Sequence, residues 1–283
     1  MRRADAESAR EGDGGLAAGD RGIEQSFGRA AVLLNVLAQS QRTGLRFTDL
    51  MHQTGFSKAT LHRLLSALSQ HGFVEIEQPG GRYFLGFQLG AWAAAVNSRY
   101  GLWERTAPIV RDLSDRVKET AYLSLRVREM AVCLVLQEGT AAIRALPLNQ
   151  GDRSALGVGS AAAAILAAIE DEDEIDRILA APDHKAYCAR RQVTEEHIRK
   201  HLARTRKLGY AFVDDLNPDM IGIALPLRGA GNQPMAALSV AAIHSRLRDA
   251  KRRDAVLAEM RTAAGQLEII LSQIPPQLGQ LSA

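Results

Sequence analysis

The stretch from Ser57 to His71 constrains the fold of this 283-residue chain more than any other feature. Its leucines follow the i, i+3, i+4, i+7 spacing of a buried helical stripe; they are Leu61, Leu64, Leu65 and Leu68. Ser57 suits the N-cap position of a helix, and Gly72 follows the last periodic residue. The sequence therefore predicts a helix over residues 58–71.

The flanking residues predict two more helices before this one and a hairpin after it. A first helix is expected over 27–38 and a short second helix over 49–54, with two N-cap residues, Ser26 and Thr48. Residues 73–77 and 82–85 alternate like strands around a Pro-Gly-Gly turn. Three helices followed by a hairpin are the layout of a winged helix-turn-helix.

The outer face of the 58–71 helix has the composition of a DNA-reading surface. No acidic residue occurs between Ser57 and His71. Small or hydrogen-bonding side chains can reach base edges in the major groove, and cations can reach phosphates. Arg82 is expected on the wing, near the DNA backbone or minor groove. The predicted DNA contacts are Ser57, Lys58, Ala59, Thr60, His62, Arg63, Ser66 and Arg82. The alternative, an ordinary solvated helix, leaves the neighbouring short helix and hairpin unexplained.

The second half of the chain predicts an α+β domain. Residues 88–118 are helical in two pieces that meet near Tyr100 and Gly101. Strands are then expected at 121–127, 131–137, 141–146, 210–214, 221–227 and 235–243. Helices are expected at 160–169, 172–180, 195–208 and about 247–274. This interleaving favours a sensor domain on an antiparallel sheet. The predicted division is a disordered tail (1–22), a winged helix-turn-helix (23–88), a linker helix (89–104), an effector-binding domain (105–275) and a C-terminal tail (276–283).

Composition narrows the classes of function. Cys133 and Cys188 lie far apart with no CxxC pattern, so both are expected to be buried thiols rather than a disulfide or a zinc site. No catalytic residue, metal site or cofactor is expected, because no nucleophile elbow, Walker loop, dinucleotide fingerprint or metal-spaced histidine pair was recognised. No apolar run reaches the roughly 20 residues that span a bilayer. The N-terminus lacks the apolar core of a secretory signal, so a cytoplasmic protein that does not bind membranes is expected.

The order of these motifs resembles the IclR family of bacterial regulators. The resemblance is carried by SFGRA (26–30), FTDL (47–50), TGFSKATLHRLL (54–65), GFV (72–74) and YFLG (83–86). It continues in the C-terminal half with LGYA (208–211), IALPL (223–227) and AALSV (236–240). The resemblance implies a GAF-like fold for the effector-binding domain, homodimers or tetramers, and control of catabolic or other metabolic genes.

Two stretches are candidates for binding an effector. Residues 157–161 open a predicted helix, where small side chains and free amides suit a carboxylate; tight helix–sheet packing is the alternative. Asp214 and Asp215 end a strand, where a surface turn or a helix cap is the alternative. The family's pocket positions match Ser160, Ala161, Gly222 and Ser239 by resemblance. The predicted effector contacts are Gly159, Ser160, Ala161, Asp214, Gly222 and Ser239, with Arg144 and Arg153 as candidate partners of a carboxylate.

These observations favour a ligand-responsive repressor or activator that binds a double-stranded DNA operator. Its effector is expected to be a small organic acid or an aromatic molecule. The large apolar residues Trp92, Val96, Leu102 and Trp103 are expected to face a second copy of the chain. Two alternatives stay open: a ligand-independent architectural DNA-binding protein, and an enzyme built on the C-terminal domain.

Overall fold

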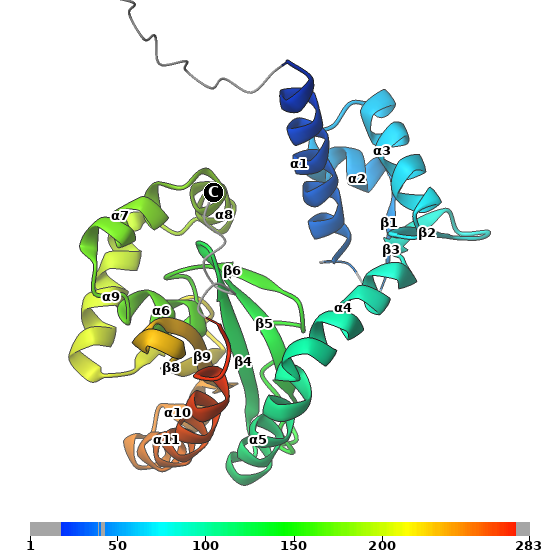
Figure 1. Cartoon of the computed structure of the whole chain (residues 1–283). Coiled ribbons are helices and arrows are strands. Elements are labelled where there is room, and N and C mark those ends of the chain that lie inside the picture. Colours follow the sequence, from blue (N-terminus) through cyan, green and yellow to red (C-terminus); the bar gives the residue numbers. More distant parts are fainter. Residues whose placement is uncertain (1–17, 39, 41–42, 276–283) are drawn as a thin grey trace, which may run out of the picture. The chain divides into compact units, whose positions relative to one another are not determined.

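The computed structural model describes residues 18–38, 40 and 43–275, so parts of both predicted tails (1–17 and 276–283) lie outside the described residues. The chain divides into two compact units, Met1–Trp92 and Ala93–Ala283 (Figure 1). This boundary falls inside a helix and within the predicted linker helix (89–104).

The first unit is a winged helix-turn-helix, as predicted. Its three helices are α1 (Ala18–Ala38), α2 (Phe47–Thr54) and α3 (Lys58–Gln70). Its antiparallel sheet has the order β1-β3-β2, formed by β1 (Leu45–Arg46), β2 (Val74–Glu77) and β3 (Arg82–Leu85). The two-residue strand β1 was not predicted, because it is too short to show an alternating pattern.

The leucine stripe of α3 forms the centre of this unit's core. Leu61 is fully buried, Leu65 and Leu68 are at most 9% exposed, and Leu64 is half-buried. They pack with buried side chains of the neighbouring elements, namely Leu33, Leu37, Leu45, Leu50 and Val74. The leucine stripe occupies the inner face of α3, and the polar residues of the helix therefore lie on its outer face.

Local capping confirms one predicted helix start and corrects two others. Ser57 Oγ accepts a hydrogen bond from the Thr60 amide at 3.3 Å, as an N-cap does. Thr48 is not the cap of α2; the Asp49 carboxylate instead accepts from the Arg46 amide at 3.0 Å. Ser26 lies inside α1, where its hydroxyl donates to the Gly22 carbonyl. Residues 18–22 are therefore helical, and the prediction of a disordered tail is wrong for them.

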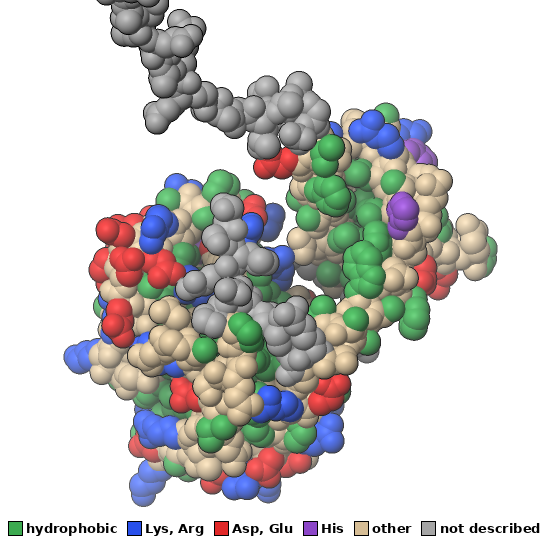
Figure 2. Space-filling view, viewed as in Figure 1, with side chains coloured by type: hydrophobic (Ala, Val, Ile, Leu, Met, Phe, Trp, Pro, Cys, Tyr) green, Lys and Arg blue, Asp and Glu red, His purple; other side chains and the backbone are tan. Residues whose placement is uncertain are grey.

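The predicted break between two helices occurs where it was expected. Helices α4 (Phe87–Tyr100) and α5 (Leu102–Val117) are separated by Gly101, whose φ of +56° favours glycine. Leu102 is only 8% exposed in the core of the second unit, so the expectation that it faces a partner is wrong. Trp92, Val96 and Trp103 are all more than 40% exposed. Figure 2 shows further hydrophobic side chains exposed on the first unit.

The second unit is built on one six-stranded antiparallel sheet, which confirms the predicted fold class. The strand order is β6-β5-β4-β9-β8-β7. The strands are β4 (Thr120–Val127), β5 (Met130–Gln137), β6 (Arg153–Ala155), β7 (Ala211–Val213), β8 (Met220–Arg228) and β9 (Pro234–Ile243). The predicted strand at 141–146 is wrong: Ile143 and Leu146 are exposed, and the segment pairs with no strand of the described sheet.

Helices cover both faces of this sheet (Figure 1). Helix α5 packs with α11 (Ala250–Leu271) on one face, and α10 (His244–Leu247) precedes α11. The buried helix α6 (Ser160–Ala167) lies on the other face, against β8 and β9. The same layer contains α7 (Glu172–Ala180), α8 (Pro182–Arg191) and α9 (Glu195–Leu208). The sequence analysis predicted α7 and α9 with these bounds and missed α8.

Two expectations from composition can be compared with the structure. Cys133 and Cys188 are free, buried thiols, as predicted. Burial raises the pKa of both thiols, to about 12 for Cys133, so both are protonated near neutral pH. Among the described residues, no helix combines the length and the apolar character needed to cross a membrane.

The buried stripe of α3 leads to a first prediction. Leu61→Ala should lower the local stability of the winged helix by about 2–5 kcal/mol, because it leaves a cavity at a fully buried position. Ile76→Ala is the matched control, since Ile76 lies in the same unit and is 42% exposed. Hydrogen exchange of peptides covering residues 45–85 measures both changes. Equal protection in the two variants would contradict the assignment of Leu61 to the core.

Candidate DNA-binding surface and effector cavity

The outer face of α3 displays most of the predicted DNA contacts. Thr60 is half-buried, and the other contacts predicted on this helix are exposed: Lys58, Ala59, His62, Arg63 and Ser66. Helix α3 carries no acidic residue. A helix with small, polar and basic residues outward and leucines inward can enter the major groove without like-charge repulsion from phosphates.

Four predicted contacts also have partners inside the first unit, namely Ser57, Thr60, His62 and Arg82. Ser57 caps α3 and donates to the Thr60 hydroxyl at 3.0 Å. The His62 ring packs on Phe47, with ring centroids 4.5 Å apart. Arg82 Nη1 donates to the carbonyls of Thr43 and Gly44, at 3.0 and 3.2 Å. Arg82 therefore connects the wing to the segment before β1 through hydrogen bonds. This structural role was not predicted from the sequence.

A cavity of about 250 Å³ lies between the N-terminus of α6 and the sheet of the second unit. Five of the six predicted effector residues line it: Gly159, Ser160, Ala161, Gly222 and Ser239. Asp214 is not in the lining; its carboxylate accepts from Arg204 Nη1 at 3.0 Å. Ser239 lies on β9, in the middle of the sheet between β4 and β8.

Glycines permit the close approach of α6 to the sheet at this point. A Cβ on Gly222 would lie 2.6 Å from Ser160 Oγ, so a side chain there would displace the first residue of α6. Gly159 has a φ of +83° and leads the chain into the helix. The first amides of a helix have no helical carbonyl to bind, and they attract anions. The N-terminus of α6 is therefore an acceptable site for a carboxylate at the cavity wall.

Helix α8 supplies two cavity residues that the sequence analysis missed. Tyr187 and Arg191 line the cavity, with the Arg191 guanidinium 5.7 Å from the centroid of the Tyr187 ring. Among the described residues that line the cavity, Arg191 is the only one with a cationic side chain. Neither predicted cation lines the cavity; Arg144 instead pairs with Glu138 at 3.3 Å, and Arg153 lies beside the lining residue Ser154 in the chain. Pro182, a residue favoured in the first helical turn, was the available signal for α8.

The remaining cavity wall combines hydroxyl groups with apolar side chains. Burial raises the pKa of Tyr122, so its phenol is neutral and donates to the Ala145 carbonyl at 3.3 Å. The other polar lining residues are Ser124, Ser154, Ser160, Tyr187, Asn217 and Ser239. Apolar lining residues include Leu148, Val158, Val213, Leu216, Met220 and Ile221. A ligand with an apolar body and a few polar groups matches this wall.

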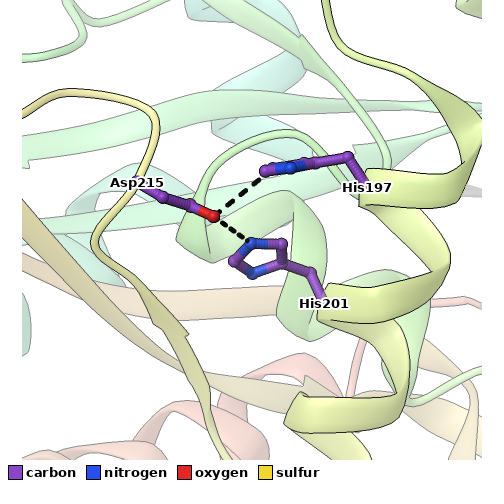
Figure 3. Close-up of side chains that lie close together, drawn as sticks. All are labelled: His197, His201 and Asp215. Carbon is purple, nitrogen blue, oxygen red and sulfur yellow. Dashed lines mark hydrogen bonds and ion pairs between the residues drawn. The ribbon is translucent and has the colours of Figure 1, made fainter.

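A separate polar cluster lies on α9 and the segment after β7 (Figure 3). His201 Nε2 is 2.9 Å from Asp215 Oδ2, and His197 Nε2 is 3.9 Å from the same oxygen. Desolvation raises the pKa of Asp215, but the hydrogen bond and charge of His201, together with His197, outweigh it and hold this pKa below its usual value. None of these three residues lines the cavity.

Two family models match the chain along most of its length. Residues 26–77 match the IclR helix-turn-helix domain. Residues 94–269 match the C-terminal domain of the bacterial transcriptional regulator IclR. The chain belongs to the IclR family. It is therefore a DNA-binding transcription regulator, as the sequence analysis expected.

Curated relatives of this IclR-family chain are also named as transcription regulators. The HTH-type transcriptional regulator XynR of Escherichia coli is 28% identical over 252 residues, which cover 89% of this chain and 97% of that protein. The transcriptional repressor IclR of Escherichia coli is 27% identical over 234 residues, 81% of this chain and 83% of that protein. Neither name is that of an enzyme.

Solved structures of IclR-family proteins share the fold. The regulator from Alicyclobacillus acidocaldarius has a TM-score of 0.70 at 20% identity and covers 87% of this chain and 98% of that one. An IclR homologue from Microbacterium hydrocarbonoxydans, complexed with 4-hydroxybenzoate, has a TM-score of 0.66 at 21% identity. It covers 88% of this chain and all of that one. These likenesses support the two-domain fold described above.

The exposed position of Arg63 on α3 leads to a second prediction. Arg63→Ala should weaken operator binding by about 1–3 kcal/mol and relax the preference at one base pair, as expected when a bidentate contact to a guanine is lost. Lys58→Ala is the comparison, because loss of a phosphate contact weakens binding to all sequences alike. Gel-shift titration against an operator selected from random DNA measures both effects. Unchanged affinity of a folded Arg63→Ala variant would remove Arg63 from base readout.

Proposed function

We propose that this regulator responds to a small organic carboxylate bound in the cavity of its second unit, and that it controls a metabolic operon. The observation that carries this proposal is the position of Arg191 beside the hydroxyl-lined, otherwise apolar cavity. Named relatives include an acetate operon repressor and glycerol operon regulatory proteins. These names are the basis for our proposal that this chain regulates metabolic genes.

The cavity offers two kinds of donor to a carboxylate. Arg191 provides a guanidinium, whose planar donors match the two carboxylate oxygens. Ser160 provides a hydroxyl beside the first amides of α6. The apolar wall excludes water from the rest of the ligand, and the small volume limits its size. Together these features favour a compact aromatic or short aliphatic acid.

Binding controls transcription only if the ligand prefers one conformation of the regulator. A ligand that binds two conformations equally shifts no equilibrium, however tightly it binds. The cavity wall draws on α6, α8, all six strands of the sheet and the segment after β7, so a ligand contacts several elements at once. We infer that it stabilises one arrangement of these elements and thereby changes the affinity for the operator.

We further propose that the regulator acts as a homodimer or tetramer. Residues 22–88 contain six Lys and Arg against four Asp and Glu, a small excess for tight binding by one module. Two copies would read the two half-sites of a two-fold operator. Large apolar side chains are exposed on α1 and α4, among them Ile23, Phe27, Phe87, Trp92 and Val96. Their burial against a second copy would remove this surface from water.

Replacement of Arg191 tests the proposed carboxylate site. Arg191→Gln should weaken binding of 4-hydroxybenzoate by about 10- to 100-fold, because a charged hydrogen-bond partner is lost, and should leave 4-hydroxybenzamide unaffected. Arg190→Gln is the matched control, since Arg190 is exposed on the same helix and does not line the cavity. Calorimetric titration of other small carboxylates and their amides extends the test if this probe does not bind.

A second variant and the other outcomes of these titrations decide whether a carboxylate binds in the cavity. Ser160→Trp should fill the cavity and abolish the response to a carboxylate, while operator binding persists. If no carboxylate stabilises the protein or changes its operator affinity, the proposal of a carboxylate effector fails. If Arg190→Gln and Arg191→Gln have equal effects, the carboxylate binds elsewhere.

The assembly proposal has its own test. Val96→Asp places a charge in the exposed apolar surface of α4 and should shift the protein to monomers, with weaker binding to a two-half-site operator. Light scattering at micromolar concentration gives the oligomeric state. A wild-type monomer with full affinity for one half-site would overturn the proposal.

A further inference from the structure

Two histidines on one face of α9 lie beside an aspartate from another element. His197 and His201 are four residues apart, the spacing that places two imidazoles on the same side of a helix. Their rings lie 4.5 Å apart between centroids. Asp215 follows β7 and points toward both rings (Figure 3). We propose that these three residues bind one divalent transition-metal ion, such as Zn²⁺.

The distances between the ligand atoms fit such an ion. One ligand atom from each residue lies within 4.8 Å of the other two. Asp215 Oδ2 is 2.9 Å from His201 Nε2 and 3.9 Å from His197 Nε2. Ligand atoms around a tetrahedral Zn²⁺ with bonds of about 2.0–2.1 Å are about 3.3 Å apart. The two observed distances lie on either side of this value, so small side-chain rotations are enough to form the site.

The chemistry and exposure of the three residues also fit. Imidazole nitrogens with a carboxylate suit Zn²⁺, Ni²⁺ and Co²⁺ rather than Mg²⁺ or Ca²⁺. The His201 side chain is 5% exposed, whereas His197 and Asp215 are 29% and 42% exposed. The site is therefore anchored in the protein and open on one side, which allows the ion to enter and water to complete its coordination.

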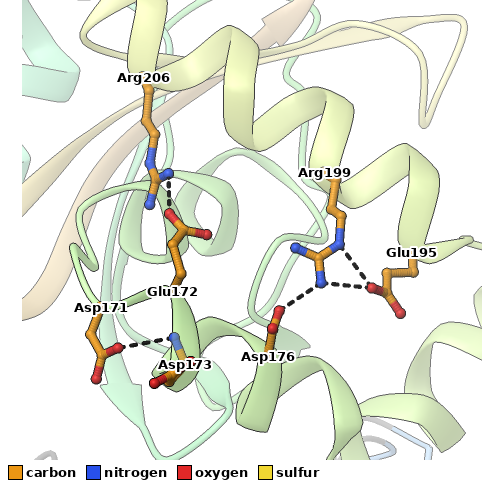
Figure 4. Close-up of polar contacts among 7 residues, drawn as sticks. All are labelled: Asp171, Glu172, Asp173, Asp176, Glu195, Arg199 and Arg206. Carbon is orange, nitrogen blue, oxygen red and sulfur yellow. Dashed lines mark hydrogen bonds and ion pairs between the residues drawn. The ribbon is translucent and has the colours of Figure 1, made fainter.

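Ion binding would break few existing contacts. Nε2 of the His201 ring forms a hydrogen bond with Asp215. Nδ1 of the same ring is buried without a hydrogen-bond partner in the described structure. Nearby arginines are already paired with carboxylates. Arg204 binds Asp214, and Arg199 binds Asp176 and Glu195 at 2.7 and 2.8 Å (Figure 4). Their charges are thus partly neutralised, which reduces repulsion of a cation.

The site has a structural consequence for the neighbouring cavity. Asp215 is flanked by Val213, Leu216 and Asn217, which all line the cavity from the segment around the end of β7. A metal bond from Asp215 to α9 would fix this segment. Helix α9 is itself held to α7 by Arg199 and by Arg206, which pairs with Glu172 at 2.6 Å (Figure 4). The metal would therefore stabilise the folded second unit, whether or not the cavity binds a carboxylate.

Titration of Zn²⁺ into the metal-free full-length chain, prepared without a histidine tag, tests this proposal. The wild type should bind one Zn²⁺ per chain at micromolar concentration, and its Tm should rise with Zn²⁺ because the ion binds only the folded state. His197→Asn and Asp215→Asn should each weaken binding by about 100-fold or more and remove the rise in Tm. Both residues are partly exposed, so these variants should fold.

His244→Asn is the matched control, because His244 lies on α10 and is not part of the cluster. This variant should bind Zn²⁺ as the wild type does. Absence of saturable binding by the wild type would overturn the proposal. Wild-type affinity in His197→Asn or Asp215→Asn would do so as well, as would an equal loss in His244→Asn. The carboxylate titrations are separate measurements, so failure of the metal site leaves the proposed effector cavity standing.

Discussion

The second unit depends on the packing of the buried helix α6 against the sheet. Six of its eight residues, from Ala161 to Leu166, are at most 7% exposed, and four of them are alanines. Small side chains allow the helix axis to lie close to β8 and β9, and Gly222 has no side chain at the point of closest approach. The N-terminus of α6 is thereby placed at the wall of the cavity. Helix–sheet packing and the proposed ligand site thus use the same small residues, and the two interpretations of residues 157–161 are compatible.

The first unit separates its structural and recognition residues in a simpler way. One face of α3 is apolar and buried, and the opposite face is polar, basic or small. The helix is therefore oriented by its leucines, and its outer residues are left for contact with DNA. Arg82 and His62 show that the separation is incomplete, because each makes a contact within the unit. Substitution of either residue would therefore remove a contact within the unit as well as the proposed contact with DNA.

Local sequence signals predicted the first unit well because its elements are defined by periodicity and caps. The stripe from Leu61 to Leu68 and the Ser57 cap both lie within α3 or next to it. The same signals failed at α8, whose polar sequence buries only His184 and Cys188. They also failed at 141–146, where apolar residues alternate without a neighbouring strand.

The cavity could be predicted only in part, because its wall is assembled from distant segments. Small residues at the start of α6 indicated its location, and the family resemblance indicated Gly222 and Ser239. Arg191 lies on α8, a helix that hydrophobic periodicity did not reveal. Asp214 forms an ion pair with Arg204 and does not line the cavity. His197 and His201 have the four-residue spacing of a metal-binding pair, so the expectation that the sequence contains no such pair was wrong. The residue that lies beside both of them, Asp215, comes from another element. The spacing of residues along the chain does not indicate that Asp215 lies beside these two histidines.

We propose that one cavity, between α6, α8 and the sheet, receives the signal that alters DNA binding. Hydrogen exchange of the full chain bound to its operator, with and without a carboxylate that changes operator affinity, tests it most directly. We expect added protection at residues 157–163, 185–192 and 213–222, which surround the cavity. An effective carboxylate that leaves all three segments unchanged and protects another part of the chain would contradict it.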